Sequence, residues 1–272
     1  MKYKIIIPLV LFISFSCSEK KEQKEEVMNK EQSVKTEEVT YSADGTELKG
    51  FLAYDENKEG QRPGIIVVHE WWGNNEYSRR RAKMLAELGY VALAVDMYGN
   101  GKQADNPKDA GKLSGEVMND TKTLEARFNA GMEFLKKQPQ TDSGSLGAIG
   151  YCFGGGVVLN MALAGSNLDG VVSFHGILPE KVSNPDEVKA KFLVCTGGAD
   201  PFVPKEQVDK FKKAMDSANV DYELISYPGA LHAFTNPAAD SSGKKFNIPI
   251  AYNKDADEKS WAEMEEFFKK IF

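Results

Sequence analysis

The sequence has few cysteines and no excess of positive charge, and each of these shortages excludes a class of protein. Three cysteines in 272 residues are too few for a disulfide framework, so a packed core must provide the stability. Lys and Arg number 34 against 40 Asp and Glu, a net charge of −6, which argues against a nucleic-acid-binding surface. With 42% hydrophobic residues and no internal repeat, the chain is suited to one sizeable core.

The sequence also lacks a hydrophobic run long enough to predict a membrane span. The apolar stretch from Ile5 to Phe15 is short and follows a basic start, which is the layout of a signal peptide. It leads to Cys17, which follows a small residue as in the lipobox of bacterial lipoproteins, although Ser14 stands where leucine is usual. We therefore expect residues 1–17 to be a lipoprotein-type signal peptide and Cys17 to be lipidated. An ordinary cleaved signal peptide with an incidental cysteine is the alternative.

Residues 18–35 are rich in Lys, Glu and Gln and contain almost no apolar residues. Such a segment cannot form a core, so we expect a disordered tether. Together with the signal peptide, it predicts a protein of the bacterial cell envelope, on the periplasmic or the surface side, that contacts the membrane only through a lipid anchor. Without lipidation, the same sequence predicts a secreted or periplasmic protein. We expect a monomer.

Residues 36–272 alternate between strand-like and helix-like patterns. Asp44-Gly45 separates two β-prone runs and predicts a hairpin. Strands are expected at 36–43, 47–54, 65–68, 90–95, 145–149, 168–174, 191–196 and 222–227, and helices at 76–88, 119–137, 157–164, 205–217 and 260–271. The alternation predicts an α/β domain whose mostly parallel sheet is covered by helices on both faces and is led by an antiparallel hairpin.

Two stretches of this domain have less defined expectations. The polar, glycine-rich residues 96–118 are expected to form a long loop or short helices. The helix at 76–88 contains Arg79, Arg80 and Arg81, and we expect these arginines to form a solvated face rather than a binding patch.

The stretch Gly-Tyr-Cys-Phe-Gly at 150–154 has the pattern of a nucleophile elbow. A buried strand is expected before it and a buried helix after it, and the two glycines allow the chain to turn tightly around Cys152. The amides that open the helix would favour negative charge at that position. The usual elbow carries serine, so a cysteine nucleophile is predicted here. An inert thiol in a glycine-rich turn is the alternative.

A thiol needs a base or a positive field to become a thiolate at neutral pH, and three histidines are available. In the α/β-hydrolase order the histidine follows the nucleophile and the acid, and only His232 leaves room for a strand carrying that acid. Asp200, after the strand at 191–196, is the candidate acid because it can accept the Nδ1 proton of His232 and fix its tautomer. A turn-forming aspartate and a structural loop histidine are the alternatives.

The loop after the strand at 65–68 reads His-Glu-Trp-Trp-Gly. In this class of fold one oxyanion-hole amide comes from that loop and the other from the residue after the nucleophile. We assign these roles to the N–H groups of Trp71 and Phe153, whereas plain packing is the alternative for the tryptophan rings. Glu70 is either a solvated surface charge or a group that controls the proton on Cys152.

Together these motifs resemble the dienelactone hydrolase family of the α/β-hydrolase superfamily. The resemblance covers roughly residues 39–272. It rests on Val68-His69-Glu70, Asp96-Met97-Tyr98, Gly150-Tyr151-Cys152-Phe153-Gly154-Gly155, Gly198-Ala199-Asp200 and His232-Ala233-Phe234. It implies an α/β-hydrolase fold with a triad of Cys152, His232 and Asp200, and no metal or organic cofactor. It also implies that Glu70 hydrogen-bonds to the resting thiol and takes its proton when substrate arrives.

The chain departs from this family where the best-known members bind the substrate carboxylate with two arginines. The corresponding positions here carry Asn100 and Asn236. Neither asparagine provides the bidentate cationic fork that carboxylate recognition favours, although Lys102 is a candidate replacement as a point charge. With Tyr98, the two asparagines are the expected pocket residues. A neutral ester or lactone is therefore expected at least as readily as dienelactone itself.

These observations predict a hydrolase of small ester or lactone substrates that works through an acyl-enzyme on Cys152. The expected partner is a small molecule. A non-catalytic envelope binding protein that retains the fold is the alternative. A thiol redox protein that uses Cys152 and Cys195 is a third interpretation, but the chain has no Cys-x-x-Cys motif, and Cys195 is expected to be a core residue of a strand.

Overall fold

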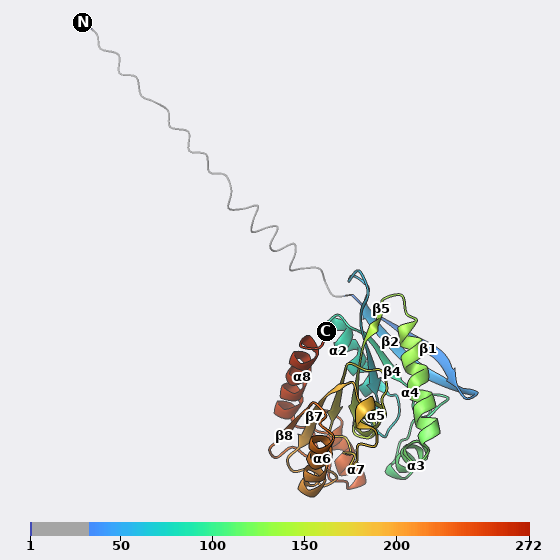
Figure 1. Cartoon of the computed structure of the whole chain (residues 1–272), viewed down its shortest axis with the longest axis vertical. Coiled ribbons are helices and arrows are strands. Elements are labelled where there is room, and N and C mark those ends of the chain that lie inside the picture. Colours follow the sequence, from blue (N-terminus) through green and yellow to red (C-terminus); the bar gives the residue numbers. More distant parts are fainter. Residues whose placement is uncertain (2–32) are drawn as a thin grey trace. The chain divides into compact units, whose positions relative to one another are not determined.

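An eight-stranded sheet forms the centre of the protein, in the order β1-β2-β4-β3-β5-β6-β7-β8 (Figure 1). The computed structural model describes Met1 and residues 33–272, so the predicted signal peptide, Cys17 and most of the predicted tether lie outside the described residues. The strands are β1 (Val34–Ala43), β2 (Thr46–Asp55), β3 (Arg62–Val68), β4 (Val91–Val95), β5 (Thr141–Tyr151), β6 (Gly170–Phe174), β7 (Lys191–Gly197) and β8 (Tyr222–Tyr227). β1–β2 and β2–β4 are antiparallel pairs, and all the other neighbours are parallel.

Helices cover both faces of this sheet (Figure 1). They are α2 (Glu76–Glu87), α3 (Pro107–Met118), α4 (Thr121–Lys136), α5 (Phe153–Leu163), α6 (Lys205–Ser217), α7 (Ala239–Phe246) and α8 (Lys254–Lys269), with a short 3-10 helix at Pro185–Glu187. The buried apolar residues of α2 and α8 belong to one hydrophobic core, and those of α4, α5 and α6 belong to a second core. Within the described residues, no helix is both long and apolar enough to span a bilayer.

β3 shows why the sheet has two cores. Its run Ile65-Ile66-Val67-Val68 is apolar at every position, and each of these side chains is at most 1% exposed. Because successive side chains of a strand point to opposite faces, Ile65 and Val67 enter the core with α2 and α8, whereas Ile66 and Val68 enter the other core. A continuous apolar run is therefore typical of a strand buried on both faces, as predicted.

The predicted hairpin is confirmed in detail. β1 and β2 pair antiparallel up to Ala43 and Thr46, and the two residues between them, Asp44 and Gly45, have φ values of 48° and 75°. Positive φ at both turn positions is what a two-residue hairpin with the right-handed strand twist requires. The first strand begins at Val34, two residues earlier than expected.

Three helical regions differ from the expectation. The stretch at 96–118 contains the regular helix α3, which starts with Pro107 after the N-cap Asn106. The last helix begins at Lys254 rather than at residue 260, because Asn253 caps it. Helix α7 was not predicted, since its eight residues are mostly small or polar and show little apolar periodicity.

The predicted solvated face of three arginines is wrong for Arg81. This side chain is 2% exposed, and its guanidinium forms an ion pair with Asp257 of α8. It also lies over the rings of Tyr77, Tyr151 and Trp261, 5.2–5.4 Å from their centroids. Aromatic faces and a carboxylate compensate for the loss of water around a buried cation.

Candidate active site

The turn at Cys152 joins the end of β5 to the start of α5. Cys152 has φ 55° and ψ −114°, a conformation that is rare for a residue other than glycine. The flanking glycines are required by close contacts, because a Cβ at Gly150 would lie 2.0 Å from the Gly154 oxygen and one at Gly154 would lie 2.3 Å from the Val68 oxygen. The tight turn that the glycine pattern predicts is therefore present, and the Cys152 side chain remains partly exposed.

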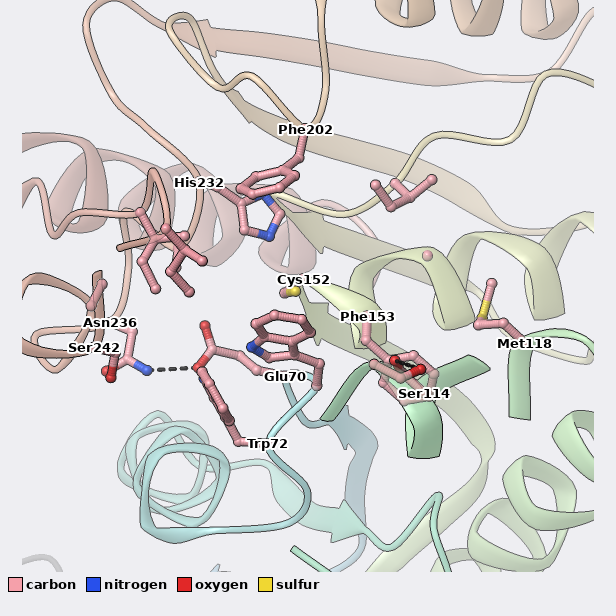
Figure 2. Close-up of a pocket in the computed structure, with 18 of the residues that line it drawn as sticks. Glu70, Trp72, Ser114, Met118, Cys152, Phe153, Phe202, His232, Asn236 and Ser242 are labelled. Carbon is pink, nitrogen blue, oxygen red and sulfur yellow. Dashed lines mark hydrogen bonds between the residues drawn. The ribbon is translucent and has the colours of Figure 1, made fainter. Parts of the chain in front are cut away.

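His232 lies between Cys152 and Asp200. Its Nδ1 is 2.7 Å from Asp200 Oδ2, and Figure 2 shows its ring next to the Cys152 sulfur. Burial disfavours a charged imidazole here, but the negative charge and hydrogen bonds of Cys152 and Asp200 outweigh it and raise the pKa of His232 to about 10. Asp200 is held in turn by the N–H of Phe202, which donates to its Oδ1. The structure thus brings together the three residues that the sequence selected.

The two candidate oxyanion amides are the N–H groups of Trp71 and Phe153. Phe153 is the first residue of α5, so its N–H has no acceptor within the helix. In the described part of the chain, neither the Trp71 N–H nor the Phe153 N–H donates to a protein acceptor. Neighbouring bonds fix the two loops: Gly154 N donates to His69 O at 3.1 Å, and Tyr98 OH donates to Trp71 O at 2.9 Å.

Glu70 is buried beside the site, with 3% of its surface exposed, so it is not a solvated surface charge. Its Oε2 accepts a hydrogen bond of 2.6 Å from Asn236 Nδ2, and Figure 2 shows this contact. The family resemblance implies a hydrogen bond from Cys152 to Glu70, and the contacts described for these residues do not include one. Burial raises the pKa of Glu70 to about 7, although the hydrogen bond from Asn236 and the nearby His232 act in the opposite direction.

A cavity of about 420 Å³ opens over Cys152 (Figure 2). Its walls come from segments far apart in sequence, including the loop at 70–72, one face of α3, the start of α5, the loop at 232–236 and α7. Its large side chains are apolar, namely Trp71, Trp72, Met118, Phe153, Ile177, Phe202, Ile248 and Ile250. Its polar lining residues are Glu70, Ser114, Cys152, His232, Asn236 and Ser242, so no lysine or arginine lines it.

The expected pocket residues divide into one that lines this cavity and two that do not. Asn236 lines it and bonds to Glu70. Tyr98 is buried behind it and supports the Trp71 loop. The pocket position expected for Asn100 is wrong: this residue is exposed, has φ 56°, and its N–H donates to Glu47 O at the hairpin. Lys102 is also exposed and does not line the cavity, so it does not replace an arginine.

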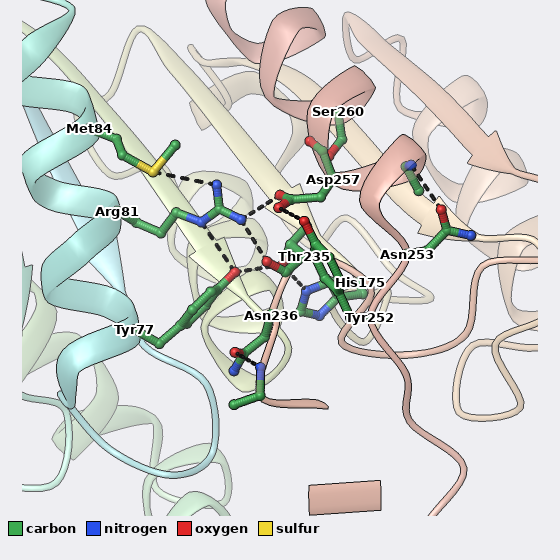
Figure 3. A network of polar contacts seen from close by, with 12 residues as sticks. Tyr77, Arg81, Met84, His175, Thr235, Asn236, Tyr252, Asn253, Asp257 and Ser260 are labelled. Carbon is green, nitrogen blue, oxygen red and sulfur yellow. Dashed lines mark hydrogen bonds and ion pairs between the residues drawn. The ribbon is translucent and has the colours of Figure 1, made fainter. Parts of the chain in front are cut away.

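A cluster of buried polar side chains adjoins the elbow and was not recognised from the sequence (Figure 3). We call it the buried network, and it consists of Tyr77, Arg81, His175, Thr235 and Asp257. Arg81 donates to Asp257, to the Thr235 carbonyl oxygen and to Tyr77 OH. Thr235 Oγ1 lies 2.6 Å from Tyr77 OH and 2.7 Å from His175 Nε2.

His175 connects this network to the nucleophile. Its Nδ1 accepts a hydrogen bond of 3.1 Å from the backbone N–H of Cys152, so its Nε2 carries the proton and donates to Thr235. Burial lowers the pKa of His175 well below its usual value, which keeps the ring neutral. Its position directly after a strand, at the carboxyl edge of the sheet, is the one signal that the sequence offered.

The remaining chemistry-bearing residues give no second centre. Cys195 is fully buried, and burial raises its pKa to about 12. It is a free thiol, as is Cys152. Among the described residues, no group of three or more His, Cys, Asp or Glu side chains is placed to hold a metal ion.

Comparison with known proteins decides the family. The sequence model of the dienelactone hydrolase family matches residues 48–272. The chain belongs to this family. Protein usf of Aquifex pyrophilus is 30% identical over 230 residues, which cover 80% of this chain and 97% of that protein. A protein of Aquifex aeolicus named provisionally as a carboxymethylenebutenolidase is 29% identical, over 73% of this chain and 86% of its own length.

A solved structure agrees with this assignment. It is described as a dienelactone hydrolase-like promiscuous phosphotriesterase from metagenomic libraries. It is 33% identical, with a TM-score of 0.83, and the match covers 88% of this chain and 99% of that one. This member of the dienelactone hydrolase family is accordingly a carboxylic ester hydrolase with the α/β-hydrolase fold.

Proposed function

We propose that the protein hydrolyses small neutral esters or lactones through an acyl-enzyme, with Cys152, His232 and Asp200 as the catalytic residues. The observation that carries the proposal is the placement of His232, which bonds to Asp200 and lies next to Cys152 in the lining of the cavity (Figure 2). A His232–Asp200 pair next to a partly exposed cysteine can stabilise the thiolate, the nucleophilic form of cysteine, when substrate arrives.

In the proposed mechanism the thiolate of Cys152 attacks the carbonyl carbon, and the carbonyl oxygen becomes an oxyanion that the Trp71 and Phe153 amides bind. The imidazolium of His232 gives its proton to the departing alkoxide, which leaves a thioester on Cys152. His232, now neutral and held by Asp200, takes a proton from water as the water attacks the thioester. The acid is released, His232 is protonated again, and Cys152 regains its resting proton from Glu70.

Glu70 enters the proposal as the group that controls the resting proton of Cys152. Its burial beside the cavity and its pKa of about 7 support this role, because a carboxyl group that titrates near neutral pH exchanges protons readily. The role requires that a carboxyl oxygen of Glu70 reach the resting thiol of Cys152, with or without its hydrogen bond to Asn236, and take the proton when substrate arrives.

The proposed preference for neutral substrates follows from the lining of the cavity. The cavity residues include no lysine or arginine, and Asn236 is paired with a carboxyl group. A carboxylate substrate would therefore find no cationic fork and would approach Glu70, which carries negative charge above neutral pH.

The test compares Cys152→Ala with the matched control Cys195→Ala, which removes a thiol from the core instead. The substrates are p-nitrophenyl acetate and a butenolide. We expect C152A to lose hydrolysis of both and C195A to retain it, with a covalent acyl adduct on wild-type Cys152 detectable by mass spectrometry. Full activity of C152A would refute the assignment. Tight ligand binding without turnover of any ester or lactone would favour the alternative of a binding protein.

A second activity, hydrolysis of neutral phosphotriesters, is proposed because the solved structure described above is named a promiscuous phosphotriesterase. The supporting observation in this chain is the cavity without cationic residues, which suits an uncharged triester. Turnover of paraoxon by the wild type and its loss in C152A would support this activity. Ester hydrolysis without any paraoxon turnover would exclude it.

We also propose that the protein is a monomer held at the cell envelope by a lipid on Cys17. The support is the sequence of residues 1–17, with its basic start, apolar stretch and lipobox-like end. Cys17→Ser should move the protein from the membrane fraction to the soluble fraction of expressing cells and abolish labelling by a palmitate analogue. Sedimentation of residues 33–272 tests the monomer.

A further inference from the structure

We propose that the part of the cavity beside α3 binds a linear apolar substituent of the substrate. The preferred substrates would then be neutral esters with a medium-length alkyl or acyl chain. The inference rests on the proposed function, since it takes the ester carbonyl to lie at Cys152. The substrate class follows from the apolar side chains on the α3 side of the cavity.

The cavity extends to two sides of Cys152, and both parts have apolar side chains, but the carboxyl and amide groups of the lining lie in only one of them (Figure 2). Figure 2 shows Ser114, Met118 and Phe153 on one side of Cys152 and Asn236 and Ser242 on the other. The second part also contains the carboxyl group of Glu70, and it can hold the polar part of a substrate. The first part, next to α3, has large side chains that are apolar.

The wall of the α3 part offers no hydrogen bond that a ligand must satisfy. Ser114 is the polar side chain that α3 contributes to the cavity. Its hydroxyl donates to the Ala110 carbonyl oxygen at 2.8 Å, within its own helix. A polar group of a substrate placed here would lose water and find only the acceptor lone pairs of the Ser114 hydroxyl, whereas an apolar chain gains by leaving water.

The apolar surface continues to the mouth of the cavity. Six large hydrophobic side chains are exposed among the described residues, and three of them, Met118, Ile177 and Phe202, line this cavity with exposures of 36%, 45% and 44%. Exposed apolar residues grouped around a concave site are typical of ligand-binding grooves. A chain that leaves the cavity would therefore still contact apolar surface.

Helix α3 also leaves room for such a chain. Gly111 and Gly115 lie one turn apart and both line the cavity. A Cβ at Gly111 would meet no atom within 4 Å, and one at Gly115 would meet only Asn119 Nδ2, at 3.8 Å. A larger side chain at either position is therefore compatible with the fold and would occupy space in the cavity. Both glycines lie inside a helix, where glycine is less favourable than alanine.

The test measures kcat/KM for p-nitrophenyl esters from acetate to decanoate and for alkyl acetates from methyl to octyl. We expect a two- to fourfold rise per added methylene in at least one series, up to about eight carbons. Gly115→Leu should abolish this rise, which is measured as the ratio of the octanoate to the acetate kcat/KM of the same variant. Lys112→Leu, which adds the same side chain to α3 outside the cavity, should leave the rise intact.

Each outcome decides between the proposals. A flat or falling response in both series, with acetate hydrolysed and C152A inactive, overturns this inference and leaves the proposed function standing. A rise that persists in both Gly115→Leu and Gly111→Leu also overturns it, because the chain then binds elsewhere; the second variant serves if the first fails to fold. No hydrolysis of any ester by the wild type overturns the proposed function and this inference together.

Discussion

Two regions that adjoin Cys152 have opposite character. The cavity of Figure 2 is lined mostly by apolar side chains and reaches solvent. The buried network of Figure 3 is polar, and its arginine, histidine and threonine are at most 2% exposed. The side chain of Cys152 belongs to the first region, whereas its backbone N–H bonds to His175 in the second.

The cavity contains the groups that face substrate, whereas the buried network contains groups that hold the elbow in place. Cys152 has an unfavourable backbone conformation, which persists only where the surroundings enforce it. The network contributes to this enforcement, because it ties the elbow through His175 to Thr235, and the Cys152 N–H also donates to the Phe174 carbonyl oxygen at 3.0 Å. Its polar groups are paired with one another, so they do not place unpaired charge in the cavity.

The largest effect is expected at Asp200, which lies outside both regions and holds the cavity residue His232. Asp200→Asn keeps the shape of the side chain but cannot hold the charge or the tautomer of His232, so kcat should fall by about 10³–10⁴. Stopped-flow measurement of p-nitrophenol release provides the rate. Asp209→Asn, on the exposed face of α6, is the control and should not change it. A D200N rate within tenfold of the wild type would show that His232 acts without Asp200.

Within the buried network, Arg81→Met should cost about 3–5 kcal/mol of unfolding free energy, because Asp257 becomes a buried charge without a partner. The double variant Arg81→Met with Asp257→Leu should recover part of this loss, since no charge is then left unpaired. Urea denaturation measures both. Lys205→Met removes the exposed ion pair with Asp209 and should give no measurable change. Equal losses of unfolding free energy in R81M and K205M would contradict the distinction between the buried and the exposed ion pair.

The parts of the fold and site that the sequence predicted depend on residues close together in the chain. The pair Asp44-Gly45 was enough to predict the hairpin turn, and Gly150 and Gly154 were enough to predict the tight turn of the elbow. The order of strands and helices then places loops after successive parallel strands at one edge of the sheet, which brings Asp200 and His232 to Cys152.

The parts that were missed depend on contacts between distant segments. Arg81 and Asp257 are 176 residues apart, and neither local pattern indicates burial or pairing. The cavity walls from α3 and α7 are equally non-local. Asn100 was placed by comparison with the family, but its left-handed turn at the hairpin keeps it outside the cavity. Charge and helical periodicity alone cannot reveal such arrangements.

Glu70 lies on the boundary between the two regions, and its titration is expected to affect stability. Its pKa is about 7 in the folded protein, raised by burial from 4.5, so the folded state holds a proton that the unfolded state releases. Stability should therefore fall as pH rises from about 4.5 to 7, by about 2–4 kcal/mol. Glu70→Gln lacks this loss, so it should exceed the wild type in stability at pH 8.5 but differ little at pH 4.5. If the difference in unfolding free energy between Glu70→Gln and the wild type were the same at both pH values, Glu70 would not be a buried carboxyl group with a raised pKa.

The smallest effect is expected at Asn236, which donates a hydrogen bond to Glu70. The hydrogen bond from Asn236 lowers the pKa of Glu70, so Asn236→Ala should raise it, by about one unit. The pH at which stability is lost should move upward by the same amount. The double variant with Glu70→Gln should show no such pH dependence, which assigns the shift to Glu70. An unchanged midpoint would mean that Asn236 does not hold this carboxyl group, and Glu70 would then belong with the groups that face substrate.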